Sequence, residues 1–293
     1  MKKFNKNIII SIIVTVIGIL GLVGPADVLA ATSPTLVGSA GYSVLGGAAV
    51  TCTGSTTTTG AVGVSPGTSI TGFPSPCTAG GGTHSNDASA IAAQADALTA
   101  FGTLNQTCDH TYGAQDLTLL SPLAPGVYCS TSAFTLSGNL TLTGSGVWIF
   151  KTVSTIITSP GSSVTGGDPC NVWWRIGSAA TLDTTTSFIG TIIAQNGTTA
   201  LNTGATLDGR VLALSAGTVT LNANVITGPT CAASSGGSSS SGSSSSTAVV
   251  PKLPDTGIGP DNKSWAPWNA ISAAIGTVLV AGSFYLIQKK RTV

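Results

Sequence analysis

Three consecutive stretches, Asn171 to Gly190 (NVWWRIGSAATLDTTTSFIG), Thr191 to Gly209 (TIIAQNGTTALNTGATLDG) and Arg210 to Gly228 (RVLALSAGTVTLNANVITG), end on glycines spaced 19 residues apart. Two similar stretches, Gly126 to Gly144 and Gly146 to Gly166, precede them. Each holds an apolar run and then two short alternating segments rich in Thr and Asn. A period near 20 with strand chemistry is typical of one turn of a β-solenoid, whose apolar side is buried by stacking. The pattern therefore predicts an all-β-dominated solenoid.

The segment from Gly41 to Phe73 shows the same alternation of apolar and small polar residues, so we expect it to supply at least one more coil. Because a helical segment separates it from the five later coils, the first coil must lie beside a later one in space. The sequence thus predicts a discontinuous solenoid of about six coils. Asn105 to Pro125 is irregular, and we expect it to cap an open end that would otherwise expose strand edges.

The segment from Ser85 to Leu104 changes to helical spacing. We expect Ser85 or Asn86 to cap this helix, Gly102 to stop it, and one narrow apolar stripe to pack against the solenoid wall. The stripe consists of Ala88, Ile91, Ala92, Ala95 and Leu98.

Both ends of the chain resemble sorting signals. Residues 1–30 combine lysines near the N-terminus, an apolar run and a small-residue cleavage pattern, which indicates a secretory signal peptide. Residues 232–252 form a Ser/Gly-rich linker that should behave as a flexible tether. The motif Leu253 to Gly257 (LPDTG), an apolar stretch at 266–287 and a basic tail resemble a Gram-positive-type LPXTG sorting signal.

This resemblance implies that residues 253–293 are read by a sortase, which cleaves between Thr256 and Gly257 and joins Thr256 to cell-wall peptidoglycan. We therefore expect a secreted protein anchored to the wall. A plain membrane anchor is the alternative.

Six cysteines lie in the middle domain, residues 31–231, and an exported chain favours three disulfides. Fifteen pairings are possible and the spacing does not choose among them; we propose Cys108 with Cys129, which closes the capping segment onto the next coil. No CxxC pair occurs, and the chain has two histidines, His84 and His110, so we expect neither a metal nor a cofactor.

Charge is scarce. Charged residues make up 7% of the chain, against about 25% in typical soluble domains. The middle domain has no basic patch for nucleic acid. Its surface must consist largely of Thr, Ser, Asn, Ala and Gly.

Strand alternation predicts which side chains face outward. Aligning the coils on their last segment places Phe188, Leu207, Val225, Val164 and Ile70 inward. The outward positions then form two parallel rows of short, uncharged residues: Gly67 and Ser69, Gly161 and Ser163, Thr185 and Ser187, Gly204 and Thr206, and Asn222 and Asn224. A second candidate face runs through Thr181, Ala200 and Thr220. Rows of regularly spaced hydroxyls and methyls can hold water in an ordered, ice-like layer, which charged groups would disturb.

The chain resembles the microbial ice-binding proteins of the DUF3494 type. The resemblance rests on SVLGGAAVT (43–51), VSPGTSITGF (64–73), LAPGVY (123–128) and NVWWRIGS (171–178), in the family's order and with the helix in the family's place. It implies a discontinuous right-handed β-helix of triangular section with one helix alongside. It also implies a monomeric domain that adsorbs to an ice crystal surface. The family's ice-face pattern of Thr, Ala or Gly, any residue, then Thr or Asn is matched in full by Thr203 to Thr206 and in part by the adjacent coils.

Two other functions are open to a β-solenoid. A polysaccharide-cleaving enzyme needs clustered carboxylates, but Asp168, Asp183 and Asp208 fall at different points of their coils. A wall-anchored adhesin for glycan or protein is the second alternative, and exposed aromatic residues would be expected to mark its site. Aromatic residues make up 5% of the chain, most of them at apparent core or membrane positions. Ice binding without enzymatic activity is therefore the favoured interpretation.

Overall fold

The computed structural model describes residues 30–228 and Cys231. The expected signal peptide, linker, sorting motif and apolar stretch at 266–287 lie outside the described residues. Within the described part, no helix is both long and apolar enough to cross a bilayer.

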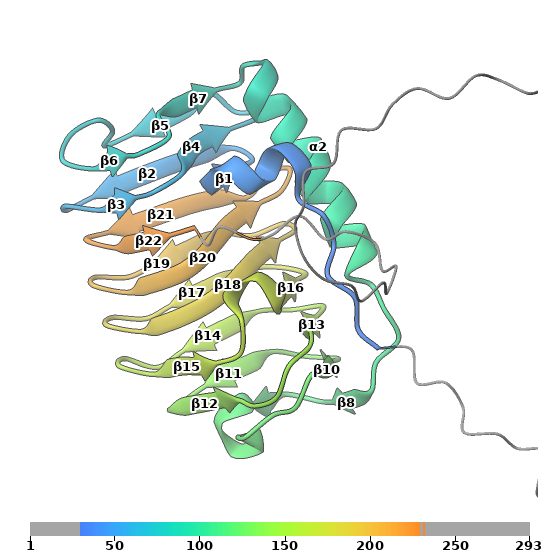
Figure 1. Ribbon diagram of the computed structural model, residues 1–293. Coiled ribbons are helices and arrows are strands. Elements are labelled where there is room, and N and C mark those ends of the chain that lie inside the picture. Colours follow the sequence, from blue (N-terminus) through green and yellow to red (C-terminus); the bar gives the residue numbers. More distant parts are fainter. Residues whose placement is uncertain (1–29, 229–230, 232–293) are drawn as a thin grey trace, which may run out of the picture. The chain divides into compact units, whose positions relative to one another are not determined.

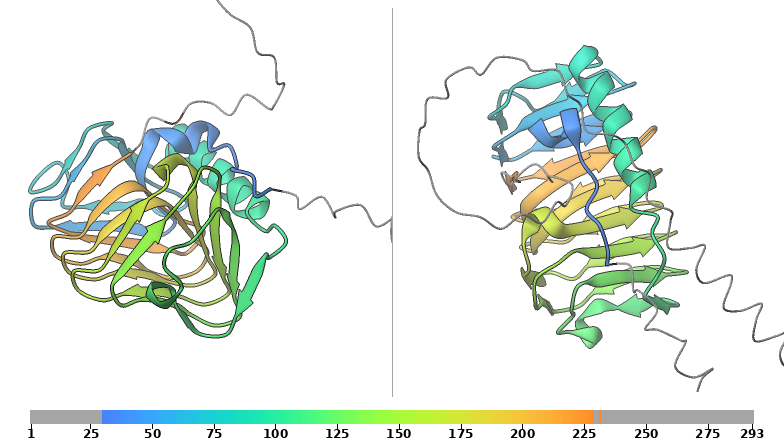
Figure 2. Two further views of the ribbon diagram at one scale, coloured as in Figure 1. Left: turned by 60° about the horizontal axis from the view of Figure 1, so that its bottom comes forward. Right: turned by 45° about the vertical axis from the view of Figure 1, so that its right-hand side comes forward.

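The described chain winds into a parallel β-solenoid with three faces (Figure 1; Figure 2, left). Each coil contributes one strand to an eight-stranded sheet, whose outer surface we call the threonine face. In spatial order its strands are β5 (Ser69–Thr71), β2 (Ala49–Thr53), β21 (Thr218–Asn222), β19 (Thr199–Leu201), β17 (Ala180–Leu182), β14 (Ile156–Thr158), β11 (Phe134–Leu136) and β9 (Gln115–Asp116).

The remaining strands form a 14-stranded sheet that covers two faces. What we call the third face holds β6 (Thr78–Ala79), β3 (Thr57–Thr58), β22 (Val225–Thr227), the first halves of β20 (Thr206–Ala213) and β18 (Ser187–Ala194), β15 (Ser163–Gly166) and β12 (Asn139–Leu142). The helix face holds β7 (Thr83–Ser85), β4 (Ala61–Val64), β1 (Tyr42–Gly46), the second halves of β20 and β18, β16 (Val172–Ile176), β13 (Trp148–Thr152), β10 (Gly126–Ser130) and β8 (His110–Tyr112). Short 3-10 turns are η1 (Val37–Gly41), η2 (Leu117–Leu120) and η3 (Pro169–Asn171).

The predicted discontinuity is confirmed. Strands β1, β2 and β3 pair in register with β20, β21 and β22, so the N-terminal coil lies on the last coil of the chain. The coil count of about six is too low, because the eight-stranded sheet draws on eight coils. The N-terminal segment, expected to supply at least one coil, supplies two, and the segment interpreted as irregular contributes β8 and β9 at the solenoid's end. Strands of two or three residues are too short to show alternation in sequence.

The 19-residue spacing between Gly190 and Gly209 has a direct structural cause. Gly190 and Gly209 stack in register where β18 and β20 bend from the third face onto the helix face. A Cβ atom on Gly209 would lie 1.8 Å from the carbonyl oxygen of Gly190, so the stacked backbones leave no room for a side chain.

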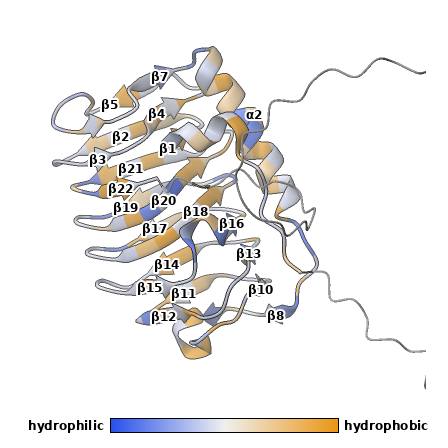
Figure 3. Cartoon of the chain, in the orientation of Figure 1, coloured by the Kyte–Doolittle hydropathy of each residue, from blue (hydrophilic) through white to orange (hydrophobic). Residues whose placement is uncertain are grey.

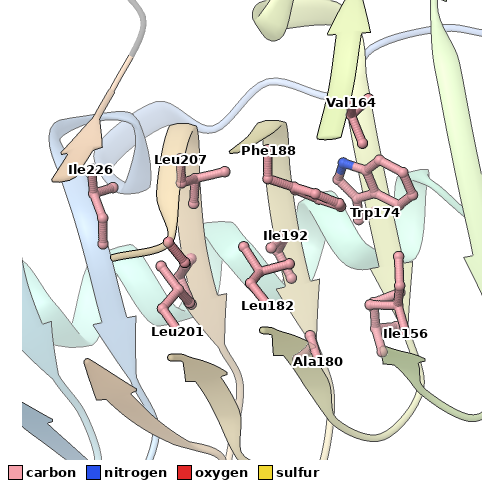
Figure 4. Packing of buried hydrophobic residues seen from close by; sticks show 14 of the residues in the cluster. Ile156, Val164, Trp174, Ala180, Leu182, Phe188, Ile192, Leu201, Leu207 and Ile226 are labelled. Atoms are coloured by element: carbon pink, nitrogen blue, oxygen red, sulfur yellow. The ribbon is translucent and has the colours of Figure 1, made fainter. Parts of the chain in front are cut away.

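The interior of the solenoid is packed by apolar residues from all three faces (Figure 4). The indole of Trp174 stacks on Phe150 at 4.2 Å and contacts Phe188 at 4.6 Å between ring centroids. Its Nε1–H donates to the carbonyl of Ile189 at 2.9 Å, which satisfies the one polar atom of this buried side chain. Stacking of aromatic rings from neighbouring coils lets large residues fill the narrow core.

The helix α2 (Ala88–Thr103) lies along the helix face, as expected (Figure 2, right). Two details of the prediction are wrong. Asp87, not Ser85 or Asn86, caps the helix through its side chain, which accepts from the backbone N–H of Ala90 at 2.9 Å. The whole expected packing stripe points outward: Ala88, Ile91, Ala92, Ala95 and Leu98 are all exposed, Ile91 and Leu98 by 53% and 55%, and α2 carries apolar colour in Figure 3.

The buried side of α2 consists of Ala90, Ala93, Ala97, Ala100 and Phe101. Alanine permits close approach of helix and sheet, whereas Ile or Leu would hold them apart, so the small residues face the wall. At the C-terminal end of the helix, the Nε–H of Arg175 donates to the carbonyl of Phe101 at 3.0 Å, and the guanidinium lies 3.9 Å from the Phe101 ring centroid. Arg175 therefore anchors the helix end.

The six cysteines form three disulfides, Cys52–Cys77, Cys108–Cys129 and Cys170–Cys231. This confirms the expected number and the Cys108–Cys129 pair. The first two bonds tie coils to their neighbours at opposite ends of the stack, and the third ties the C-terminal end of the described chain to η3.

Candidate functional site

The threonine face carries a continuous central row of outward side chains. The row runs in strand register through Thr71, Thr51, Thr220, Ala200, Thr181, Ile157 and Thr135. Five of the seven positions are threonine. Paired strands place successive members about 4.7–4.9 Å apart. Threonine is stiff at χ1, so the row presents hydroxyls and methyls in a fixed array.

Two further rows flank the central one. On one side Ser69, Ala49 and Thr218 lie in register, and the Thr218 hydroxyl shares a 2.9 Å hydrogen bond with that of Thr198. On the other side, next to the third face, Thr53 pairs with Asn222. The amide of Asn222 donates to the Thr203 hydroxyl at 2.8 Å, so neighbouring coils fix each other's side chains. In each flanking row, a hydrogen bond therefore ties side chains of neighbouring coils together.

Carboxylates lie at the margins of the threonine face. Asp183 lies at its border with the third face, where hydrogen bonds from the Asn202 amide at 3.0 Å and from the Thr184 N–H lower the pKa of its carboxyl. Asp116 follows Thr135 at the far end of the central row. Between Thr71 and Thr135 the central row itself has no charge.

The structure divides the expected site residues among several places. Ser163, Ser187 and Thr206 are brought together in register, pointing outward on the third face. Gly161, Thr185 and Gly204 stack at the corner between the third face and the threonine face, each with a positive φ (72°, 56° and 75°). These six residues form two adjacent rows, as the alternation predicted.

The other four expected residues do not join these rows. Asn222 lies on the margin of the threonine face. Ser69 belongs to that same sheet, in register with Ala49, and Gly67 occupies the preceding corner, where a Cβ atom would clash with the carbonyl oxygen of Ala48. Ile70, expected inward beside Phe188, is inward but in the eight-stranded sheet and only half-buried.

Asn224 is a further correction: it was expected outward and is fully buried, while Val225, expected inward, is 50% exposed and pairs with Thr206. The reason is hydrogen bonding. The Asn224 side-chain amide donates to the carbonyls of Asn202 and Ala205 at 2.9 and 3.0 Å, and its Oδ1 accepts from the N–H of Asn222 at 2.6 Å. A polar residue that satisfies backbone groups inside a corner can be buried where a simple apolar pattern predicts exposure.

The sequence named Thr181, Ala200 and Thr220 as a second candidate face but missed Thr51, Thr71 and Thr135. The available signal was the alternation in VTCT (50–53) and SIT (69–71), which places threonine on one side of each strand. Recognising the row required knowing that the N-terminal strands join the sheet of the last coils.

The geometry defines a class of protein: a discontinuous parallel β-solenoid with a flank helix and a flat, uncharged, threonine-rich face, without an evident catalytic cluster in the described chain. Residues 44–227 match the family model described as "Ice-binding-like". The chain belongs to this family.

Individual relatives agree. An ice-binding protein of Nostoc sp. (strain HG1) is 40% identical over 209 residues, which cover 67% of this chain and 75% of the relative. A crystal structure of an ice-binding protein from an Antarctic biological consortium matches with a TM-score of 0.62 at 36% identity, covering 70% of this chain and 95% of that one. The ice-binding protein of the Antarctic ascomycete Antarctomyces psychrotrophicus matches with a TM-score of 0.62 at 33% identity, covering 68% of this chain and 100% of that one.

Proposed function

We propose that this protein binds ice through the threonine face and thereby restrains ice growth and recrystallisation or holds its bearer to ice. The observation that carries the proposal is the uncharged central row, five threonines among seven in-register positions. The family membership and the ice-binding relatives support it.

The threonine face is a better main contact surface than the third face. Its eight strands pair without interruption. On the third face, β15 and β18 share a single register pair, and η3 packs against β18 and β20. Asp208 also points outward there, and burial and the nearby charge of Asp168 raise the pKa of its carboxyl. A continuous flat array suits a crystal surface better than an interrupted one.

The physical role of threonine follows from its two branches. The methyl groups restrict the orientation of first-shell water, and the hydroxyls between them anchor that water by hydrogen bonds. Because the array is rigid, the layer is ordered before ice is met, and little entropy is lost on adsorption. A carboxylate or ammonium group would orient water around itself instead. No chemical step is required of the protein.

A direct test is to purify residues 30–231 and watch a single ice crystal grow in their presence. The two solved relatives described above consist almost entirely of the matched part, so this domain is expected to fold alone. We expect faceted crystals, a gap between melting and freezing temperatures, and slower recrystallisation. Domain with its three disulfides reduced and alkylated is the matched control. Unshaped, circular crystals with folded domain would contradict the proposal.

We further propose that the protein acts outside the cell, attached to the wall. The three disulfides support an oxidising compartment. The sequence features at 1–30 and 253–293 support export and sortase attachment at Thr256. Many copies on one cell would act multivalently, so weak adsorption of each domain could hold a cell to ice.

Anchoring can be tested by expressing the full chain in a sortase-bearing host and fractionating the cells. We expect protein that ends at Thr256 linked to wall fragments, and its loss in the variant Thr256→Ala. If the wild-type chain and the Thr256→Ala variant are both recovered intact in the membrane fraction, still carrying residues 266–293, wall attachment is contradicted. That outcome has no bearing on ice binding.

A further inference from the structure

The Cys170–Cys231 disulfide lies where the chain leaves the solenoid. Cys231 is the last described residue, and the Ser/Gly-rich linker expected from the sequence begins at the next position. The disulfide joins Cys231 to Cys170 in η3, which lies 61 residues earlier in the chain. A pull on the linker therefore has two routes into the domain. It reaches β22 through the backbone and η3 through the disulfide.

The first route ends on a weakly held strand. β22 has three residues, and Ile226 alone among them is buried. All three pair with β20 and two pair with β3. After the strand, the N–H of Gly228 donates to the exposed hydroxyl of Thr59 at 2.9 Å. A pull from the C-terminal end would load the bond nearest that end first, so the bonds would fail one after another.

The second route ends on firmly held strands. β16 follows η3 directly and buries four of its five residues, Val172, Trp173, Trp174 and Ile176. All five pair with β13 and four pair with β18, so β16 lies inside the 14-stranded sheet (Figure 1). On the other side of η3, β15 pairs through four residues with β12. A load at Cys170 is therefore shared by several strands.

The turn η3 is itself braced on both sides. The Asp168 carboxylate accepts from the N–H of Cys170 at 3.0 Å and from the side-chain amide of Asn171 at 3.2 Å. The Ser33 hydroxyl donates to the Asn171 side-chain oxygen at 3.0 Å and accepts from the Trp173 indole N–H at 3.0 Å. These bonds tie η3 to the N-terminal segment and to β16.

The chain between the two cysteines forms the middle of the solenoid. It runs from β16 to β22 and supplies Thr181, Ala200 and Thr220 to the central row. The N-terminal coil pairs with the last coil of this stretch. Without the disulfide, a pull could draw the stretch out by about 200 Å, at roughly 3.4 Å per residue. With the disulfide closed, the stretch is a loop that a pull at Cys231 cannot extend.

We infer that the Cys170–Cys231 disulfide is a mechanical bypass, which carries a pull on the linker past β22 into η3 and the strands beside it. The threonine face then stays folded while the linker is pulled away from ice. The inference rests on the proposed function, in which ice holds one side of the domain and the wall holds the linker. Under load, the lifetime of the contact follows the rate of forced unfolding, so the first element that bears the load decides it.

The test uses beads that carry the domain with its linker (residues 30–252), attached through either the C-terminus or the N-terminus. Adsorption to ice is recorded at rest, and the time that beads stay on ice is then measured under flow. With C-terminal attachment, Cys170→Ser/Cys231→Ser should shorten this time at least about tenfold, because the load then falls on β22. With N-terminal attachment, wild type and variant should stay for similar times, because the load no longer enters at position 231.

The two attachments separate a mechanical role from a merely structural one. Equal retention of wild type and variant with C-terminal attachment would overturn the bypass, and so would equal shortening with both attachments. Ice binding would stand in either case. Failure of wild-type beads to adsorb at rest would instead overturn the proposed function. The matched control is Cys108→Ser/Cys129→Ser, which removes a disulfide at one end of the stack and should be retained as wild type is.

Thr59→Ala is a second test that keeps all three disulfides and changes an exposed residue. It removes the hydroxyl that accepts from Gly228, the tie that a load on β22 would meet first. If the disulfide carries the load, retention with C-terminal attachment should equal that of wild type. Shortened retention with unchanged adsorption at rest would show that the load reaches β22. That result would overturn the inference even if the Cys170→Ser/Cys231→Ser variant fails to fold.

Discussion

Thr220→Tyr is expected to reduce the thermal hysteresis of the purified domain to less than about a tenth of the wild-type value, the scale of loss seen when a central contact residue of an interface is disrupted. Thr220 is exposed on β21, between Thr51 and Ala200 in the central row. A phenol ring there stands above its short neighbours and holds the ice lattice away from the whole row. The measurement is nanolitre osmometry over a concentration series.

The matched control is Thr99→Tyr, at a threonine of α2 that is also exposed. Both variants should keep the wild-type free energy of unfolding within about 0.5 kcal/mol, because surface changes away from special features cost little. Equal hysteresis in Thr220→Tyr and Thr99→Tyr would show that the threonine face is not the main contact surface.

Asn224→Ala is expected to lower the free energy of unfolding by about 3–5 kcal/mol. The substitution leaves the carbonyls of Asn202 and Ala205 and the N–H of Asn222 without their partner in a buried corner. An orphaned buried group costs about 1–3 kcal/mol. In a domain of this size, the loss corresponds to a melting temperature lowered by about 6–20 °C. Calorimetry with the disulfides intact measures the shift.

Asn222→Ala is the control for that effect. Asn222 is only partly buried, and its side-chain amide bonds the exposed Thr203, so its removal should cost less than about 1 kcal/mol. A similar small loss in Asn224→Ala would contradict the structural role given to the buried corner.

The solenoid was predictable because its cause is periodic. The stacked backbones at Gly190 and Gly209 exclude side chains, so two successive coils need glycine at the same point of the repeat. Alternation likewise placed Phe188 and Leu207 inside and Ser187 and Thr206 outside, as observed. Cysteine spacing, by contrast, left the pairing open, and two of the three bonds were not anticipated.

The errors arose where a residue's environment comes from distant parts of the chain. Asn224 is inside because carbonyls of the preceding coil and the Thr56 hydroxyl of the N-terminal coil surround it. Ile91 and Leu98 face outward because alanines allow closer packing of α2 on the helix face, a comparison that a helical pattern alone does not make.

The repeat period, the strand alternation and the composition of the chain were sufficient to predict a discontinuous β-solenoid that is poor in charge and has one helix packed alongside. Only the folded molecule decides which side presents the flat array. Membership of a face depends on where each corner falls and on which strand pairs with which. For Thr51 and Thr71 that partner is β21, from far along the chain, so their place beside Thr220 exists only after the N-terminal coils have stacked on the last one.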